Sequence, residues 1–283
     1  MTEKTTDGEG GWFEGLERGD LEGAREAIEN RSAESPADWP AQAVEAGFAT
    51  DEGDYYDALH EATVPTAREA AAEREQSDDQ QLIHSIRAMD DATRTANELA
   101  ERVAEWAGSR FDRSETGIPG ARAVAAREPE NPADERLVGL AARVVALDEE
   151  ASNLREFVER AAGEVAPNLT TLGGPVLAAR LIALAGGLKT LARKPSGTLQ
   201  VLGAEEALFA HLRGRAPSPK HGIIYTHEYV RDTAREHRGS AARALAGKLT
   251  IAARIDYYSG DRRPNLEREL DARIERIRAR SDP

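Results

Sequence analysis

The stretch APNLTTLGGPVLAARLIALAGGLKTLARKPSGTLQVLGAEEALF, residues 166–209, decides the fold of this 283-residue chain. Short blocks of Ala, Leu, Val and Ile are separated by Gly and Pro, the residues that most strongly interrupt helices. Pro175 suits the first turn of a helix, and the Gly pair at 186–187 suits its end. We therefore expect a helix over residues 175–185, a turn over 194–197 and a second short helix over 204–212.

Helical patterns continue on the C-terminal side of this stretch. Residues 240–257 carry one apolar face, formed by Ala242, Leu245, Leu249, Ala252 and Ile255. The last segment, 265–280, is amphipathic, with Leu266, Leu270, Ile274 and Ile277 spaced by helical turns. We expect an all-helical domain over residues 166–258, followed by an amphipathic helical tail over 259–283.

On the N-terminal side, apolar residues repeat every seven positions. Over residues 133–165 two rows form the a and d positions of a coiled-coil seam, which includes Leu137, Leu140, Val144, Leu147, Leu154 and Val158. Residues 80–111 carry a looser repeat, and a Gly- and Pro-rich turn over 117–132 separates the two. Helices of ~30 residues, each ~45 Å long, would pack antiparallel as a hairpin. We assign 79–165 to a coiled-coil region that dimerises or spaces two functional ends; an ordinary helical-bundle core is the alternative.

Residues 1–78 are acidic and less clearly patterned. Trp12, Phe13 and Leu16 provide apolar side chains for a small core, and short helices are expected over 21–28 and 66–74. A partly disordered acidic arm and a small folded domain fit this composition equally well. The expected architecture is therefore mainly α, a long antiparallel coiled-coil hairpin followed by an all-helical domain, with a small N-terminal α/β domain.

Charge is distributed unevenly along the chain. Asp and Glu number 22 against 6 Lys and Arg in residues 1–80, 17 against 11 in 81–165, and 12 against 20 in 166–283, within a net charge of −14. An asymmetry of this size indicates that one segment meets a polyanion. The pI near 5.0 and the scarcity of Lys are typical of a salt-adapted protein, with an acidic mesophilic protein as the alternative.

Several chemistries lack the residues that they need. The chain has no Cys, which excludes disulfides, thiolate catalysis and Cys-ligated metals. Its six His form no i, i+4 pair, and neither HExxH nor a phosphate-binding glycine motif occurs. We expect no catalytic site, no metal and no cofactor. No apolar run reaches the ~18 residues of a membrane span and no signal peptide is evident, so we expect a cytoplasmic protein with no membrane partner.

The basic C-terminal third favours nucleic-acid binding, because Lys and Arg contact phosphates and base edges. Aromatic residues that could stack on single-stranded bases are sparse there, with Phe209 and Tyr225 and no RNP-type run. We therefore expect recognition of a structured RNA by its shape and backbone.

Residues 164–256 resemble a Nop domain. The motifs that carry the resemblance are APNLT at 166–170, AARLI at 178–182, GLK at 187–189, PS at 195–196, QVLGAE at 200–205, ALF at 207–209, PKHG at 219–222 and AARID at 252–256. Further upstream, the residues that resemble the family's first coiled-coil helix are Asn97, Leu99, Glu101, Arg102, Glu105, Trp106 and Phe111. The resemblance covers residues 80–258 and is to the archaeal Nop-family scaffold of box C/D ribonucleoproteins.

The resemblance implies a non-catalytic scaffold in three parts. An N-terminal α/β domain docks the methyltransferase fibrillarin, and a coiled coil forms a homodimer. The Nop domain binds a kink-turn of box C/D guide RNA that a ribosomal-protein-type kink-turn binder already holds. The assembly methylates ribose 2′-hydroxyls of rRNA and tRNA. The residues expected at or near RNA are Lys189, Arg193, Gln200, Gly203, Ala204, Glu205, Lys220, Arg243, Lys248 and Arg254.

Two features depart from the family pattern. Glu206 stands where the family has a basic residue, and a carboxylate cannot neutralise a phosphate. The docking domain within residues 1–78 is short and weakly matched, so fibrillarin binding follows from domain order. Two other functions stay open: a Nop-domain RNA-assembly factor outside methylation, and a helical protein–protein adaptor that binds no RNA.

Overall fold

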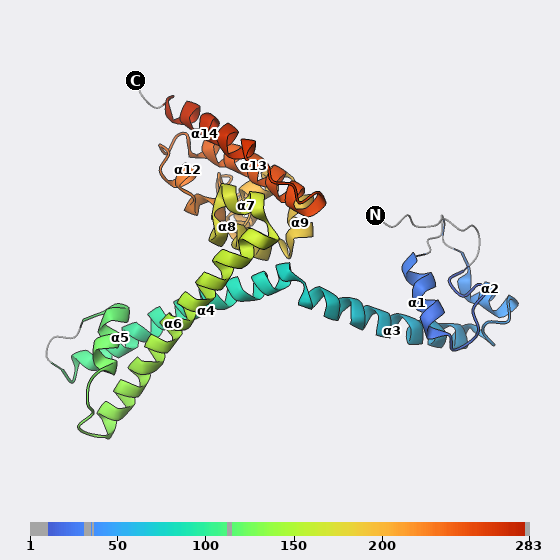
Figure 1. Ribbon diagram of the computed structural model, residues 1–283, viewed down its shortest axis with the longest axis horizontal. Helices are drawn as coiled ribbons and strands as arrows, with labels where there is room; N and C mark the ends of the chain where they lie inside the picture. Colours follow the sequence, from blue (N-terminus) through green and yellow to red (C-terminus); the bar gives the residue numbers. More distant parts are fainter. Residues whose placement is uncertain (1–10, 31–34, 36, 112–114, 281–283) are drawn as a thin grey trace. The chain divides into compact units, whose positions relative to one another are not determined.

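The computed structural model describes residues 11–30, 35, 37–111 and 115–280, which form helices, turns and loops but no strand (Figure 1). The mainly helical fold expected from the sequence is confirmed. Contacts between residues divide the chain into two compact units, Met1–Ser77 and Asp78–Pro283.

The first unit is built around an aromatic cluster and three helices, α1 (Leu21–Asn30), α2 (Trp39–Glu45) and α3 (Glu52–Gln76). Phe13 stacks on Phe48 with ring centroids 5.6 Å apart, and the indole N–H of Trp12 donates to the hydroxyl of Tyr55 at 3.2 Å. The expected small α/β domain is not confirmed, since the described part of residues 1–78 contains no strand. Helices and turns enclose the aromatic side chains without a sheet.

Helix α3 is longer than the sequence suggested, because it runs through Pro65. The expected helix over 66–74 began after this proline, whereas α3 begins at Glu52. The side chain of Asp51 caps this start by accepting from the backbone N–H of Asp54 at 2.9 Å. A proline removes one backbone donor from a helix, and here that loss does not end α3.

The second unit begins with a helical hairpin formed by α4 (Asp78–Gly108) and α6 (Pro132–Val165) (Figure 1). The expected antiparallel hairpin is confirmed. The a row is buried on both helices, at Leu82, Met89, Ala96, Val103, Leu137, Val144, Ala151 and Val158. The d-row residues Leu140, Leu147 and Leu154 are only half-buried. The a row therefore makes the contact between the two helices of one chain.

The connection between the hairpin helices contains a helix over residues 117–125, which corrects the first part of the expected turn over 117–132, while residues 126–131 form turns and loop. Helix α5 (Gly117–Ala125) packs on both α4 and α6 through the buried residues Ala121 and Val124. Gly117 has a φ of +69° and starts the helix, so this glycine begins an element instead of ending one. The sequence pattern was misread because Gly and Pro also stand at helix starts.

The rest of the second unit packs around α13 (Arg238–Tyr258). Ala242, Leu245, Ala246, Leu249 and Ala252 of α13 are fully buried. The elements that pack on it are α7 (Pro167–Gly173), α9 (Leu188–Arg193), α10 (Ser196–Gln200), the 3₁₀ turn η1 (Ile223–Thr226), α12 (Glu228–Arg231) and α14 (Asn265–Arg278). Helix α8 (Pro175–Ala185) packs on α4, α6 and α7, and α11 (Glu205–Leu212) has no buried residue. Because Leu270, Ile274 and Ile277 of α14 belong to the same buried core, α14 is part of this domain.

Polar contacts join the hairpin to this domain. The guanidinium of Arg180 on α8 pairs with Asp90 on α4 at 2.5 Å, with a second bond at 3.1 Å. The backbone N–H of Leu188, at the start of α9, donates to the carboxylate of Asp79 at 3.0 Å. Leu82, Ile83 and Ile86 of α4 also lie in the domain's core. The base of the hairpin is therefore built into the domain.

Among the described residues, no single helix has the length and hydropathy to cross a membrane. Helices α7 and α8 have the necessary length and hydropathy only when taken together, and the chain bends by 117° between them.

Candidate RNA interface

The carboxylate of Asp256 on α13 caps the start of α7. It accepts from the backbone N–H groups of Asn168 and Leu169 at 3.0 and 2.8 Å, and from the side-chain amide of Asn168 at 2.6 Å. The first N–H groups of a helix have no partner within the helix, and Ala166 at the N-cap supplies none. These bonds explain why the APNLT and AARID motifs occur together: they fix α7 on the central helix.

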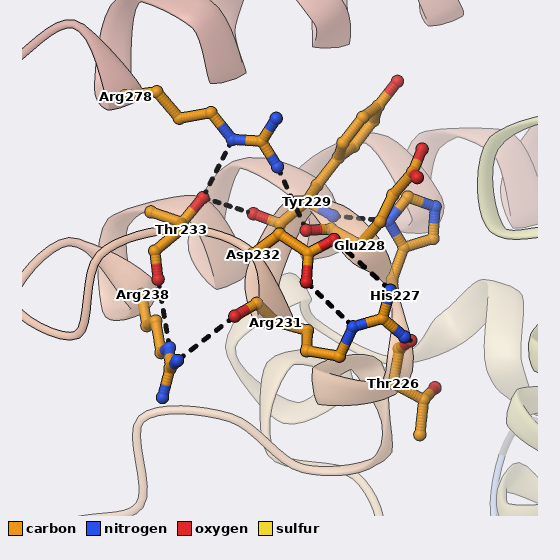
Figure 2. A network of polar contacts seen from close by, with 9 residues as sticks. All are labelled: Thr226, His227, Glu228, Tyr229, Arg231, Asp232, Thr233, Arg238 and Arg278. Carbon is orange, nitrogen blue, oxygen red and sulfur yellow. Dashed lines mark hydrogen bonds and ion pairs between the residues drawn. The ribbon is translucent and has the colours of Figure 1, made fainter.

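A polar network around α12 fixes α14 and the start of α13 (Figure 2). Arg278 of α14 donates to the hydroxyl of Thr233 at 3.2 Å and to the carbonyl of Glu228 at 3.0 Å. Arg238 of α13 donates to the carbonyls of Thr233 and Arg231 at 3.0 and 3.2 Å. Two arginines from different helices thus hold one short segment between them.

Two further side chains in this network have shifted pKa values. The Nδ1 of His227 accepts from the backbone N–H of Tyr229 at 3.1 Å and caps α12. Burial lowers the pKa of His227. The hydroxyl of Tyr229 donates to the carboxylate of Asp271 on α14, and this bond raises the pKa of Tyr229 to about 12. The histidine is therefore neutral and the tyrosine protonated near neutral pH.

A groove of about 1120 Å³ lies between α13, α14 and the loop before η1, and four of the ten expected RNA residues line it: Gln200, Lys220, Arg243 and Lys248. The side-chain amide of Gln200 donates to the carbonyl of Lys220 at 2.7 Å. Lys220 and Arg243 are exposed. Segments far apart in the sequence thus bring cationic side chains to one surface.

Gly222 holds the lysine loop against α10. Its backbone N–H donates to the carbonyl of Gln200 at 2.9 Å, and the N–H of Ile223 donates to the carbonyl of Leu202 at 2.8 Å. A Cβ at residue 222 would lie 2.0 Å from the carbonyl oxygen of Leu202, a distance that no side chain tolerates. The glycine of the PKHG motif therefore permits the close approach that places Lys220.

Lys248 is less available for an anion than the other groove residues. Its ammonium pairs with the carboxylate of Glu269 on α14, and its side chain is 23% exposed. This ion pair crosses from α13 to α14 and neutralises the charge of Lys248. Lys248 therefore joins two helices, in addition to lining the groove.

Three expected residues lie outside the groove, around α9. Lys189 and Arg193 are exposed on α9 itself. The guanidinium of Arg254 on α13 donates to the carbonyl of Ala192 at 3.1 Å. Arg254 therefore holds the end of α9, while the neighbouring Asp256 caps α7.

The remaining three expected residues form the turn into α11. Gly203 has a φ of +83°, and its backbone N–H donates to the carboxylate of Glu205 at 2.8 Å. Ala204 is the residue before the helix. Glu205 thus makes a bond within the turn. Glu206 lies on a hollow of about 280 Å³ that Arg213 and Arg215 also line, so basic side chains stand near the position where Glu206 departs from the family pattern.

Three arginines that were not expected from the sequence also line the groove. Arg273, Arg276 and Arg280, on or just after α14, line it together with Lys220 and Arg243. Their spacing of three and four residues was present in the amphipathic pattern of residues 265–280, which was used to predict a helix and not a cationic face. Among the described residues, no group of three or more His, Asp or Glu is placed to hold a metal ion.

A helical hairpin built into an all-helical domain, with a cationic groove on that domain, defines a helical protein with a surface suited to a polyanion. Residues 124–278 match the family model "Nop: snoRNA binding domain, fibrillarin". This match covers more than half of the chain, which therefore belongs to the Nop family.

Other proteins are similar to this chain in sequence over about half of its length. An uncharacterised NOP5 family protein of Methanocaldococcus jannaschii is 49% identical over 142 residues, which are 50% of this chain and 34% of that protein. Nucleolar protein 58 of Rattus norvegicus is 37% identical over 147 residues, 52% of this chain and 28% of that protein. The aligned part thus spans about a third of each relative.

The fold also resembles a solved structure. A chain in the crystal structure of a fibrillarin/Nop5p complex superposes on this chain with a TM-score of 0.53. The two chains are 25% identical in sequence, and the match covers 90% of this chain and 92% of that chain. The similarity therefore extends beyond the domain that the family model covers.

Proposed function

We propose that this chain is a non-catalytic scaffold of a box C/D guide ribonucleoprotein. It binds kink-turn RNA through the second unit and positions a fibrillarin-type methyltransferase for 2′-O-methylation of rRNA and tRNA. The observation that carries the proposal is the groove, where Gln200, Lys220 and Arg243 meet from three separate segments of a Nop-family chain. Holding substrate and catalyst together supplies the entropic part of catalysis.

Each part of the chain has a place in this proposal. The first unit docks the methyltransferase, which is supported by the similarity to a chain of the fibrillarin/Nop5p complex. The α4–α6 hairpin joins two copies, and the half-buried d row with the 40% exposed Phe157 gives it apolar surface for this contact. The groove and the exposed α9 cations contact RNA held by a ribosomal-protein-type kink-turn binder.

Reconstituted methyl transfer tests the proposal. Guide RNA, target RNA, the kink-turn binder and a fibrillarin-like methyltransferase are mixed with and without this chain, and methylated target is counted. We expect guided methylation only when the chain is present, and none from the chain alone with the methyl donor. Equal methylation without the chain would contradict the scaffold role, and methylation by the chain alone would make it an enzyme.

A further inference from the structure

The groove has a second cationic wall. Arg273, Arg276 and Arg280 line it from the α14 side, while Lys220 and Arg243 line it from the loop and from α13. All three arginines are exposed. Arg273 and Arg276 lie within the residues that match the family model, but none of the motifs quoted from the sequence includes a residue of α14.

The orientation of α14 is set by contacts on its other faces. Leu270, Ile274 and Ile277 are buried in the core, and Arg278 is bonded to Thr233 and Glu228 (Figure 2). A helix held on one face presents residues three and seven positions apart along another. The three arginines therefore form a fixed stripe and not a set of unrelated surface charges.

The stripe matches the length of a nucleic-acid backbone segment. Seven residues of helix span ~10 Å at 1.5 Å per residue. Stacked nucleotides rise by ~3.4 Å each along the axis of a helix, and successive phosphates of one strand lie farther apart than this rise, so the stripe spans about two to three phosphates. Guanidinium groups bind phosphate oxygens with paired N–H donors, which lysine cannot do.

Basic side chains outnumber acidic ones in the lining of the groove, which favours an anionic ligand. Six basic side chains line it, against the two acidic residues Glu236 and Glu269, and Glu269 is already paired with Lys248. The groove is also continuous from Lys220 to Arg280. A ligand bound at the lysine loop would therefore extend onto α14.

We propose that Arg273, Arg276 and Arg280 bind the phosphate backbone of the RNA that Lys220 and Arg243 contact, so that α14 is the second wall of an RNA-binding groove. This proposal rests on the proposed RNA-binding function. It extends the RNA contact to a helix that the sequence marked only as an amphipathic tail. An acidic protein partner is the competing ligand, and the experiment includes it as an outcome.

The test measures RNA affinity in the full-length chain, with kink-turn RNA and the ribosomal-type partner, at several salt concentrations. The groove variant carries Arg273→Gln, Arg276→Gln and Arg280→Gln. The control variant carries Arg262→Gln, Arg263→Gln and Arg268→Gln, which remove the same charge from positions that do not line the groove. Circular dichroism checks that both variants stay folded.

We expect the groove variant to bind at least tenfold more weakly than the control. Because each phosphate contact contributes ~0.9 to the dependence of log K on log salt, the slope should fall by about two to three. In the opposite direction, Glu269→Gln leaves Lys248 without its carboxylate, so this variant should bind RNA more tightly than wild type.

The outcomes separate this proposal from the proposed function. If Lys220→Ala weakens RNA binding while the groove variant binds like the control, the α14 proposal is wrong and the RNA-binding function stands. If the wild-type chain fails to bind kink-turn RNA, both are wrong. If the groove variant keeps its RNA but loses a protein from the reconstituted complex, the stripe recognises an acidic protein and the proposal is overturned.

Discussion

Some motif residues of this chain are exposed on the groove, and others make hydrogen bonds within the protein. Lys220 and Arg243 are exposed and line the groove. Arg254 and Glu205 make hydrogen bonds within the protein. All four were expected at or near RNA because they match family motifs, and a motif alone does not distinguish a residue that contacts a ligand from one that holds the site in place.

Replacing Asp256 by Ala should destabilise the domain by about 1–3 kcal/mol, because two backbone N–H groups at the start of α7 lose their acceptor. Chemical denaturation followed by circular dichroism measures the change in the free energy of unfolding. Asp261→Ala is the control, since its carboxylate makes only an exposed contact with Arg263 at 3.4 Å. Equal stability of the two variants would show that the cap is not needed.

Stability should depend on pH through His227. Its pKa is lowered in the folded state, first by burial and then by Arg231 and Arg278, while Glu228 and a hydrogen bond to Leu172 oppose the shift. The unfolded chain therefore takes up a proton near pH 6.5 before the folded chain does. The stability that the folded chain gains from a neutral His227 is therefore complete above this pH and is lost as the pH falls.

The measurement compares denaturation midpoints at pH 7.5 and 5.5. His227→Asn can still cap α12 but does not titrate, so it should lose less stability on acidification than the wild type. The same change at exposed His60 in the first unit is the control. An identical pH dependence in wild type and His227→Asn would rule out this residue as the source.

At the scale of elements, periodicity predicted most of the second unit. The heptad repeat predicted the α4–α6 hairpin, and the amphipathic spacing predicted α14. The sequence missed α5 and the first half of α3, because Gly117 and Pro65 looked like interruptions. Tertiary contacts stabilise both helices despite these residues. In α5 the side chains of Ala121 and Val124 are buried, and in the first half of α3 those of Tyr55, Ala58 and Ala62 are buried.

Leu147→Asp should convert the proposed dimer into a monomer and leave the hairpin folded. Leu147 lies in the half-buried d row, between the two buried clusters that hold the hairpin together. Light scattering should give a mass near that of one 30.7 kDa chain. Ala146→Asp, at an exposed neighbouring position, should remain dimeric. An unchanged dimer mass for Leu147→Asp would show that the d row is not the contact between copies.

At the scale of the whole molecule, the segment with the most positive charge is also the segment that forms the groove. Residues 166–283 carry the excess of Lys and Arg, and the groove lies within them. Composition could predict this segregation, since it needs only a count. It could not predict the groove, because Lys220, Arg243 and Arg273 meet only after α13 and α14 have packed.

RNA crosslinking should follow the same division. In the complex with kink-turn RNA and its partner protein, photo-crosslinks should map to residues 189–280 and be absent from residues 11–77, whose acidic side chains repel phosphate. Mass spectrometry of crosslinked peptides gives the positions. Crosslinks concentrated in the first unit would place the RNA elsewhere.

The most direct test of the account is the affinity of the full-length chain for kink-turn RNA when the groove loses two cations. With the ribosomal-type partner present, Lys220→Ala combined with Arg243→Ala should weaken binding at least tenfold, because charge-assisted hydrogen bonds contribute about 1.5–3 kcal/mol each. The control, Arg262→Ala with Arg268→Ala, should bind like wild type. Wild-type affinity in the Lys220 and Arg243 double variant would contradict the assignment of this groove to RNA.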